Sequence, residues 1–496
     1  MEIVSPLPVI GILAAGLTSL ATAIWGQTAK NRAIFGITGS IIAFLSVVAM
    51  IPGALKGTIY AVTLIKFLPG ISIKFRADSL GLLFAIVSSS MWVLVNIYTI
   101  GYMDHEEHKH RFFAFFALAI FAALGIALSE NLVNLFLFYE ILTLSTYPLV
   151  VHAGTKEAYK AGIKYLVYTL TGGGFLLAGI VITYFLTGTL SLSQPGILAS
   201  ANATPALLRT LFFFFLIGFG VKAGIMPMHH WLPSAMVAPT PVSTLLHAVA
   251  VVKAGVFGIL RTVYFIFGVD LMKQLGLGWI LATFAAVTIL AASIIAIRQD
   301  HLKRRLAYST ISQLSYIVFA AALLSPAATI AAFIHIAAHA FSKGTLFMCA
   351  GMITHETGKT NVSQMKGLAN RMPVTMAMFS IAAFSMIGAP PLAGFVTKWF
   401  LGQGALQANQ PYLVLVLIFS AVLNMAYFLP IIYTAYFDKP GEEIEPVENL
   451  PRETSPYMLW PVVGTATMTF ILGIFAGLPG LPMSIAKLAS TIFFKG

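Results

Sequence analysis

The segment LFFFFLIGFGVKAGIMPMHHWLP, residues 211–233, decides the fold, because it places a lysine in an oily helix and then breaks that helix. The run from Leu211 to Gly220 carries no charge. Lys222 follows, and Pro227 then removes a backbone donor and kinks the chain. Broken backbone at membrane depth is tolerated only where it lines protein or water. The segment therefore predicts a membrane-spanning helix that opens to a cavity beside its lysine.

The composition of the whole chain predicts the same environment. Its 496 residues are 58% hydrophobic and 9% charged, with a mean hydropathy of +0.90, whereas soluble proteins carry about 25% charged residues. Long apolar runs such as VTILAASIIAI, residues 287–297, favour helices over the short alternating strands of a barrel. We therefore predict an all-α polytopic membrane protein.

About fourteen apolar stretches are long enough to cross a bilayer, for which about 20 helical residues suffice. The first is expected to be retained, because an acid stands where a signal peptide has its basic region. A final segment, 482–495, is expected at the membrane interface, and the longest polar loops are 53–77, 354–372 and 438–455. The expected spans are 6–26, 33–52, 78–100, 112–128, 131–151, 161–187, 207–227, 239–264, 276–297, 306–323, 328–352, 373–401, 411–437 and 456–478.

The basic residues predict the orientation and exclude one class of partner. With the N-terminus outside, 16 of the 29 Lys and Arg residues fall in inner loops, 9 on the outer side and 4 inside spans. The positive-inside rule then favours both termini outside. These residues are scattered singly, so the net charge of +12 does not indicate nucleic-acid binding. The single cysteine, Cys349, excludes a disulfide framework.

Five charged residues stand inside the predicted spans, where each costs about 2.5–3.5 kcal/mol on insertion scales. They are Glu140, Lys222, Lys253, Lys343 and Lys398. A single lysine near the end of a span can reach the interface with its long side chain, and that alternative applies best to Lys222 and Lys398. Five such residues together predict a connected charged path through the protein.

Histidines extend this path. His335, His339 and Lys343 are spaced by four residues and share one face of a helix, and His247 shares a span with Lys253. Imidazole can relay protons near neutral pH, and the alternative is that these side chains only pack in the core. No metal site is expected, because no third ligand is near the histidine pair.

Two broken spans occupy matching positions. The seventh breaks at Pro227, after Lys222, and the twelfth at Pro390 and Pro391, before Lys398. Spans 4–8 and 9–13 then form two five-helix units of opposite orientation, and inverted repeats with discontinuous helices are typical of transporters. The expected division is 1–111 for the first three helices, 112–266 and 267–437 for the two repeats, and 438–496 for an acidic loop, the last helix and the C-terminal segment.

The chain resembles the antiporter-like membrane subunits of respiratory complex I, Mrp-type cation/proton antiporters and membrane-bound hydrogenases. The resemblance covers nearly the whole chain. It rests on FYEILTLSTYPLV (138–150), KAGIMPMHHWLPSAMVAPTPVSTLLHAVAVVKAGVFGILR (222–261), HLKRRLAYSTISQLSYI (301–317), HAFSKGTLFMCAG (339–351) and GAPPLAGFVTKWF (388–400).

The resemblance implies fourteen helices with two inverted five-helix repeats and broken helices 7 and 12. It implies that Glu140 pairs with Lys222, that Lys253 continues the line, and that Lys398 ends it on the broken twelfth span. Between them the resemblance places the stripe of His335, His339 and Lys343. Length and Lys398 look most like the Mrp D subunit.

We hypothesise that a proton moves along Glu140, Lys222, Lys253, Lys343 and Lys398, helped by the histidines and by water. Unit charges about 4 Å apart interact by roughly 4 kcal/mol at an effective dielectric of about 20. Withdrawing the Glu140 carboxylate is therefore expected to release the proton of Lys222. Lys398 is expected to exchange protons with the outer side.

The function that follows is proton translocation by one subunit of a Mrp-type Na⁺/H⁺ antiporter in a prokaryotic plasma membrane, beside homologous antiporter-like subunits. The chain is not expected to be an enzyme by itself or to hold a cofactor. The glycine run TGGG, 171–174, lies inside an apolar span, where it favours close helix packing rather than phosphate binding. One alternative is a proton-pumping subunit of a redox-driven complex, NADH-quinone oxidoreductase-like or hydrogenase. Others are a non-transporting structural subunit and a solute transporter, and whether this chain carries sodium stays open.

Overall fold

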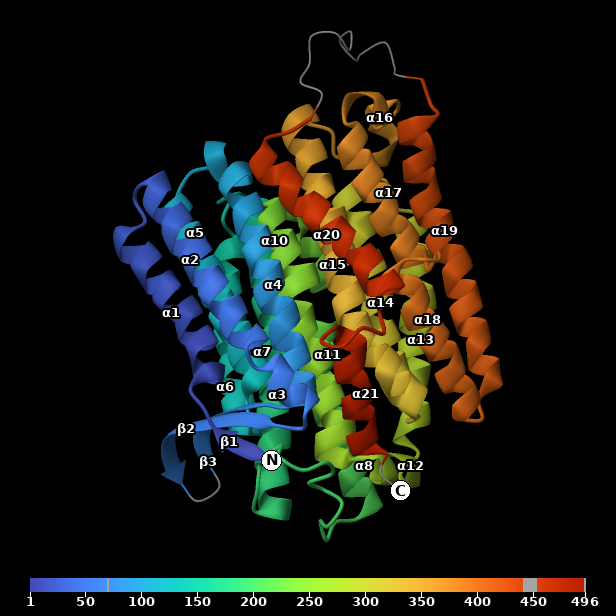
Figure 1. The fold of residues 1–496 in the computed structure, drawn as a ribbon. Coiled ribbons are helices and arrows are strands. Elements are labelled where there is room, and N and C mark those ends of the chain that lie inside the picture. The colour runs from blue at the N-terminus through green and yellow to red at the C-terminus, as the bar shows by residue number, and fades with distance from the viewer. Residues whose placement is uncertain (69–70, 440–452, 495–496) are drawn as a thin grey trace.

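The computed structural model describes residues 1–68, 71–439 and 453–494, and it is a helical bundle with a small sheet at one end (Figure 1). The first half contains α1 (Leu7–Trp25), α2 (Ala29–Val48), α3 (Ile51–Leu55), α4 (Ser79–Tyr102), α5 (Lys109–Leu128), α6 (Leu132–Val150), α7 (Lys156–Thr187), α8 (Pro205–Ala223), α9 (Trp231–Ser234), α10 (Thr240–Thr244) and α11 (Val251–Arg261). The second half contains α12 (Val269–Gln274), α13 (Leu277–Ile297), α14 (Leu302–Ala322), α15 (Pro326–Thr357), α16 (Leu368–Arg371), α17 (Pro373–Ile387), α18 (Ala393–Gln407), α19 (Val414–Tyr436), α20 (Pro456–Ile474) and α21 (Pro482–Phe493).

Within these described ranges, twelve helices are long and apolar enough to cross a membrane, which confirms the prediction of a helical polytopic protein. Two of the fourteen predicted spans are not among the twelve. One is α14, whose first turn carries several basic residues, and the other is divided into α17 and α18. The N-terminus and α21 lie at the same end of the bundle (Figure 1), as an even number of crossings requires. The count of fourteen and the inverted repeats stay predictions.

The prediction of a polar loop at 53–77 is wrong, because most of this segment forms a β-hairpin. Strand β2 (Ile59–Leu68) pairs antiparallel with β3 (Ile71–Ala77), and β1 (Glu2–Val4) adds in parallel to β2. The alternation of β-branched and polar residues in IYAVTLIKFL and ISIKFRA favours strands. The sequence analysis missed this pattern, because the lysines in both runs are typical of a polar loop. Most of the predicted acidic loop 438–455 lies outside the described residues.

Both predicted helix breaks are present, and each has a local cause. α8 ends before Gly224, which adopts a left-handed conformation with φ +74°. The indole nitrogen of Trp231 donates to the Val221 carbonyl at 2.8 Å and so adds a side-chain donor to the last turn of α8, where the Gly224 backbone nitrogen also donates to that carbonyl. α17 ends before Gly388, whose φ is +98°.

The centre of the bundle is α15, which packs against α4, α14, α17, α18, α20 and α21. Beside it, the segment Thr240–Phe267 is entirely buried. Two π-helical turns interrupt this segment, η3 (Leu245–Val249) and η4 (Thr262–Phe267), and the sequence analysis did not predict them. A π turn changes the direction of the side chains that follow it and is frequent at functional sites. Here η3 carries His247 and stands just before Lys253.

Candidate functional site

The predicted site residues come from six helical segments that meet inside the bundle. The middle members are buried, whereas Glu140 and Lys398, at the two ends, are partly exposed. These residues, called the line below, therefore have a buried centre and two partly exposed ends. By element, the residues are Glu140 on α6, Lys222 on α8, His247 on η3, Lys253 on α11, His335, His339 and Lys343 on α15, and Lys398 on α18.

Lys222 is held by the backbone next to Glu140. Its Nζ donates to the Tyr139 carbonyl oxygen at 2.5 Å and lies 3.4 Å from the centre of the Tyr139 ring. A carbonyl dipole and an aromatic face both stabilise an ammonium group. Glu140 Oε1 is buried without a hydrogen-bond partner, and the ion pairs of the described residues do not include Glu140. The pairing of Glu140 with Lys222 stays a prediction.

The glycine run on α7 makes room for the Glu140 carboxylate. A Cβ on Gly173 would collide with Glu140 Oε1, whereas a Cβ on Gly174 would meet no atom within 4 Å. Gly172 serves helix packing, because a Cβ there would lie 3.1 Å from the Val221 side chain on α8. The predicted role of the run in close packing is confirmed, and one of its glycines also faces a charged group.

Lys253 is joined directly to the histidine stripe. Its Nζ lies 2.8 Å from His339 Nδ1 on α15, and His339 Nε2 is buried without a partner. Gly255 lets α11 approach α8 closely, because a Cβ there would collide with the backbone at Ala223. Lys222 and Lys253 therefore stand on two helices in contact, although no hydrogen bond between their described side chains joins them.

The stripe continues from His339 to α18. The ring centroids of His339 and His335 are 5.9 Å apart, and the His335 ring stacks on Tyr316 at 5.8 Å. His335 Nδ1 lies 3.1 Å from Thr397 Oγ1. Because Thr397 precedes Lys398, this contact brings the histidine stripe to the last lysine of the line.

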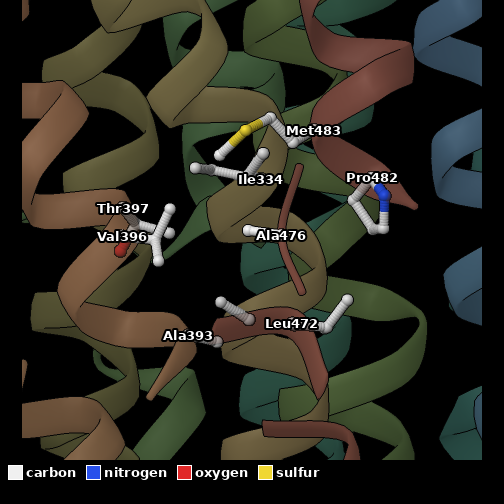
Figure 2. A pocket seen from close by; sticks show the side chains of 9 residues that line it. Ile334, Ala393, Val396, Thr397, Leu472, Ala476, Pro482 and Met483 are labelled. Atoms are coloured by element: carbon white, nitrogen blue, oxygen red, sulfur yellow. The ribbon is translucent and has the colours of Figure 1, made fainter. Parts of the chain in front are cut away.

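Thr397 also lines a small cavity. Figure 2 shows its lining, in which Thr397 stands among hydrophobic side chains such as Ile334, Val396 and Met483. Its volume of about 10 Å³ has room for about one water molecule. A space of this kind, with one polar group and apolar walls, can act as a constriction that conducts only when it is wetted.

Lys398 sits on the end of the broken helix. Its Nζ donates to the carbonyls of Met386 at 3.1 Å and Ile387 at 2.6 Å, which are the last residues of α17. These carbonyls form the negative end of the helix dipole and stabilise a cation. Gly388 keeps the place open, because a Cβ there would lie 2.7 Å from Lys398 Cδ. The break predicted from Pro390 and Pro391 thus exposes the carbonyl groups that bind the Lys398 ammonium group.

Four buried polar residues that the sequence analysis did not single out form a hydrogen-bonded chain that begins at Lys343. Lys343 Nζ donates to Ser309 Oγ at 2.6 Å, and Ser309 Oγ lies 2.8 Å from the Tyr427 hydroxyl. That hydroxyl lies 2.6 Å from the amide of Asn424, and Gln313 stands beside it. All four are fully buried.

A signal for these four residues was present in the sequence. Ser309 and Gln313 are four residues apart in HLKRRLAYSTISQLSYI, so they share a helix face. Asn424 and Tyr427 stand three apart in the mostly apolar span 411–437. Neutral polar residues attract less notice than charges, yet buried ones require partners just as strictly.

The His247 side chain, like that of Glu140, makes no hydrogen bond within the part of the chain that the structure describes. Both ring nitrogens are buried without partners, and the ring centroid lies 4.7 Å from that of Phe347. The structure therefore places His247 in the interior but does not link it to the line. In the described ranges, no three His, Cys, Asp or Glu side chains gather as metal ligands would.

Comparison with known proteins extends these observations. The family described as NADH:quinone oxidoreductase/Mrp antiporter, TM matches residues 129–424. The family described as NADH-Ubiquinone oxidoreductase (complex I), chain 5 N-terminus matches residues 69–113. The N subunit of the NADH-quinone oxidoreductase of Desulforudis audaxviator is 34% identical over 412 residues, which cover 80% of each chain.

Two further relatives are longer proteins. The A/B subunit of a probable K⁺/H⁺ antiporter of Rhizobium meliloti is 32% identical over 91% of this chain and 45% of its own length. The A1 subunit of a Na⁺/H⁺ antiporter of Staphylococcus aureus is 31% identical over 88% of this chain and 57% of its own length. The chain thus spans about half the length of these antiporter relatives.

Two solved structures have similar folds. A chain of the Mrp complex from a Dietzia species superimposes with a TM-score of 0.83 and 27% identity, covering 98% of this chain and 51% of that one. A chain of an archaeal membrane-bound sulfane sulfur reductase gives a TM-score of 0.88, covering 99% and 98%. At 23% identity this second likeness concerns the fold alone.

Proposed function

The chain belongs to the family of NADH:quinone oxidoreductase and Mrp antiporter membrane subunits, and on that premise we propose that it translocates protons within a multisubunit complex of the prokaryotic plasma membrane. The observation that carries the proposal is the line of ionisable side chains across the bundle. Its centre is buried, and its ends at Glu140 and Lys398 reach the surface. Neither end of such a line is closed off by the chain itself, so homologous subunits packed there can exchange or sense charge.

The proposed proton path uses the contacts of each lysine in turn. Lys222 holds its proton on the Tyr139 carbonyl and releases it when the Glu140 carboxylate is withdrawn or neutralised. Lys253 passes charge to His339 across 2.8 Å. The stripe of α15 then leads to Lys398, where the end of α17 supplies carbonyl acceptors. Thr397 and the cavity beside it offer an exit for a proton carried by water.

The two broken helices support an internal symmetry in this proposal. α8 and α17 each end before a left-handed glycine. One lysine of the line stands on each broken helix, Lys222 on α8 before the break and Lys398 on α18 after it. We assign them to matching positions in two inverted repeats, 112–266 and 267–437. The first three helices, 1–111, and the segment 438–496 flank these repeats.

We assign the complex to the Mrp-type Na⁺/H⁺ antiporters, and the chain to a D-type subunit within it. Antiporter subunits among the relatives and the Mrp complex among the solved structures support the first assignment. The alternative is a redox-driven proton pump, in which the chain is the proton-carrying subunit beside catalytic ones. The 34% identity to the N subunit of an NADH-quinone oxidoreductase, over 80% of both chains, favours that alternative.

Transport in everted vesicles separates these functions. The complete operon is expressed in an antiporter-deficient host, and proton movement is followed with a pH-sensitive fluorophore. The Mrp assignment predicts sodium-dependent dequenching, which disappears with Glu140→Ala. Proton movement that appears only with an electron donor would favour the redox-driven complex instead. Full transport in Glu140→Ala, and in variants that replace each lysine of the line, would instead favour a non-transporting structural subunit.

Complementation tests the D-type assignment. Operons of a known Mrp antiporter are prepared without the gene for their A-type protein or without the gene for their D-type protein, and this chain is supplied in each. We expect it to restore sodium-dependent transport only in the operon that lacks the D-type gene. Restoration of the operon that lacks the A-type gene would overturn the assignment.

A methyl group beside Glu140 should impair transport. Gly173→Ala places a Cβ against Glu140 Oε1, and misplacing a reacting group by about 1 Å can cost up to about 100-fold in rate. We expect transport to fall by about tenfold to 100-fold. Gly174→Ala is the matched control, because it adds the same methyl group to the same helix where no atom lies within 4 Å. Equal transport rates in the two variants would contradict a role for the carboxylate position.

A further inference from the structure

We propose that one anionic phospholipid binds along the packed junction of α3, α4 and α21, with an acyl chain in an apolar groove and its phosphate group at a basic end. α21 packs against both α3 and α4, and the junction lies near the end of the bundle that carries the N-terminus (Figure 1). Two hollow spaces follow each other along it, one apolar and one with polar walls. The binding site rests on these spaces and on charge, and not on the proposed proton path.

The first space is an apolar groove among the membrane-spanning helices. Its volume is about 340 Å³, and α2, α4, α15 and α20 all contribute to its walls. Ser90 is the one polar side chain in the described lining, and its hydroxyl donates to the Val87 carbonyl of the same helix at 3.1 Å. The groove therefore offers no free side-chain group to a polar ligand, whereas the acyl chains that surround spanning helices match its walls.

The second space, called the polar cavity below, is smaller and has mixed walls. Its volume is about 100 Å³, which leaves room for several water molecules. Apolar residues of α21 form one part of its lining, and the other part carries the polar side chains of Thr58, Arg76, Asp78, Ser79 and Ser193. Such walls suit the region where a lipid changes from acyl chain to head group.

The helices pass from the groove to the polar cavity in one consistent direction. Each of the three lines both spaces, and the residue pairs are Ile51 and Ala54 on α3, Ile86 and Leu80 on α4, and Pro482 and Leu488 on α21. At a rise of about 1.5 Å per residue, the two members of a pair are separated by about 5–9 Å along their helix. One lipid molecule can therefore reach both spaces, with its chain beside Ile86 and its head group beside Leu80.

Two lysines at the polar cavity have no partner within the described part of the chain. Lys56 directly precedes Gly57, Lys487 directly precedes Leu488, and both of these neighbours line the polar cavity. Both lysines are exposed, and neither forms an ion pair or a side-chain hydrogen bond with another described residue. They are therefore free to bind a phosphate group, and basic pockets beside membrane helices bind anionic lipid head groups.

The acidic residues at this end do not neutralise the two lysines. Glu2 is bound by Lys74 at 3.0 Å and by Arg76 at 3.2 Å. Asp78 is bound by Arg261 at 2.5 Å. These three basic partners outnumber the two carboxylates, so positive charge remains even before the two unpaired lysines are counted. An anionic head group is thus favoured over a neutral one.

The groove also borders the small cavity that Thr397 lines. Leu472 and Pro482 belong to the walls of both spaces, and Figure 2 shows them beside the small cavity. An acyl chain in the groove is therefore separated from that cavity by one layer of side chains, and it keeps water from entering the cavity through the groove. This consequence rests on the proposed proton path, whereas the binding itself does not.

The melting temperature of the purified complex that contains the full chain tests the binding. The complex is delipidated in a neutral detergent, and phosphatidylglycerol, phosphatidylcholine or inorganic phosphate is added in increasing amounts. A ligand that binds only the folded state raises the melting temperature with its concentration. We expect phosphatidylglycerol to act at a lower mole fraction than phosphatidylcholine, and phosphate at the same low concentrations to have no effect. Equal action of the two lipids, or a rise with phosphate, would overturn an anionic lipid as the ligand.

A pair of double variants assigns the effect to the basic end. Lys56→Gln with Lys487→Gln should weaken the action of phosphatidylglycerol about 30-fold, which corresponds to about 1 kcal/mol for each basic residue at a membrane surface. Lys66→Gln with Lys273→Gln is the matched control. It removes two exposed lysines, on β2 and α12, from the same end of the bundle (Figure 1), and neither of them lines the groove or the polar cavity.

A second pair of variants tests the groove. Ser90→Phe places an aromatic ring in the groove, and we expect it to abolish the stabilisation by phosphatidylglycerol. Thr283→Phe is the matched control, because Thr283 is exposed on α13 outside the groove lining. Its hydroxyl likewise bonds its own helix, at the Trp279 carbonyl.

The proposed site requires that both the Lys56–Lys487 double variant and Ser90→Phe respond, while their controls behave like the wild type. Full action of phosphatidylglycerol on either test variant contradicts it. A wild-type complex that phosphatidylglycerol does not stabilise contradicts it as well, and indicates that a neighbouring subunit covers the groove. None of these outcomes bears on proton translocation, which Glu140→Ala tests separately in vesicles.

Discussion

Replacing Lys222 with methionine is expected to abolish transport while leaving the chain inserted in the membrane. The side chain is fully buried, and its Nζ is held between the carbonyl and the ring of Tyr139. Methionine is unbranched and apolar, so it can fill the space that the lysine stem occupies. What it removes is the only proton carrier on α8 next to Glu140. We expect sodium-dependent dequenching in everted vesicles to fall to the level of the empty host.

Arginine at the same position distinguishes a carrier from a structural cation. Lys222→Arg keeps the positive charge, but a guanidinium is not deprotonated in proteins. A relay that must release its proton should therefore fail, whereas a fixed charge on the Tyr139 carbonyl should be tolerated. We expect Lys222→Arg to insert normally and to transport no better than Lys222→Met.

Lys303→Met is the matched control for both variants. Lys303 also donates to a backbone carbonyl, that of Ala238 at 2.9 Å, but it stands off the line at the start of α14. We expect transport to persist in Lys303→Met. Loss of transport in Lys303→Met as large as that in Lys222→Met would show that lysines outside the line are equally required, which would contradict the specific path.

The helix breaks could be predicted from sequence because proline and glycine act locally. Pro227 and Pro390 mark places where a helix cannot continue, and the structure ends α8 and α17 a few residues before each. The charged residues were predictable for a similar reason, since any Glu or Lys within an apolar run stands out. That local signal located all five charges, but it could not tell which of them touch.

The partners of these charges could not be predicted, because they depend on which helix faces are turned together. Lys222 is bound by a backbone carbonyl of α6, which no sequence pattern marks. Lys253 contacts His339 on a helix that follows the π turn η3, and no sequence pattern marked that turn. Asn424 and Tyr427 were passed over since neutral polar residues are common in apolar helices. The hairpin β2–β3 was missed because its lysines resembled those of a loop.

Arg261→Leu is expected to destabilise the protein strongly without touching the proton path. Arg261 is fully buried, and its two terminal nitrogens donate to the Asp78 carboxylate at 2.5 and 3.0 Å. Asp78 also accepts from the Gly81 backbone nitrogen at 2.8 Å and so caps α4. The pair therefore ties the start of α4 to the end of α11. Removing one partner of a buried ion pair costs about 3–5 kcal/mol when the other charge is left uncompensated. Arg76, 3.6 Å from Asp78, stays as a second cation, so we expect the loss to lie at the lower end of that range.

The double variant Asp78→Asn, Arg261→Leu separates this cause from simple loss of contacts. Asparagine can still cap α4 through its side-chain oxygen and removes the carboxylate charge that Arg261 balanced. Arg76, the other cation beside Asp78, keeps its ion pair with Glu2 at 3.2 Å. We expect it to recover most of the stability that Arg261→Leu loses, measured as the melting temperature of the purified complex in detergent. Lys74→Ala is the control for a surface pair, because Lys74 bonds Glu2 at 3.0 Å with both side chains partly exposed, and such pairs contribute about 1 kcal/mol or less. A melting temperature of the double variant as low as that of Arg261→Leu would assign the loss to the packing of Arg261 between Phe257 and Phe265 rather than to its charge.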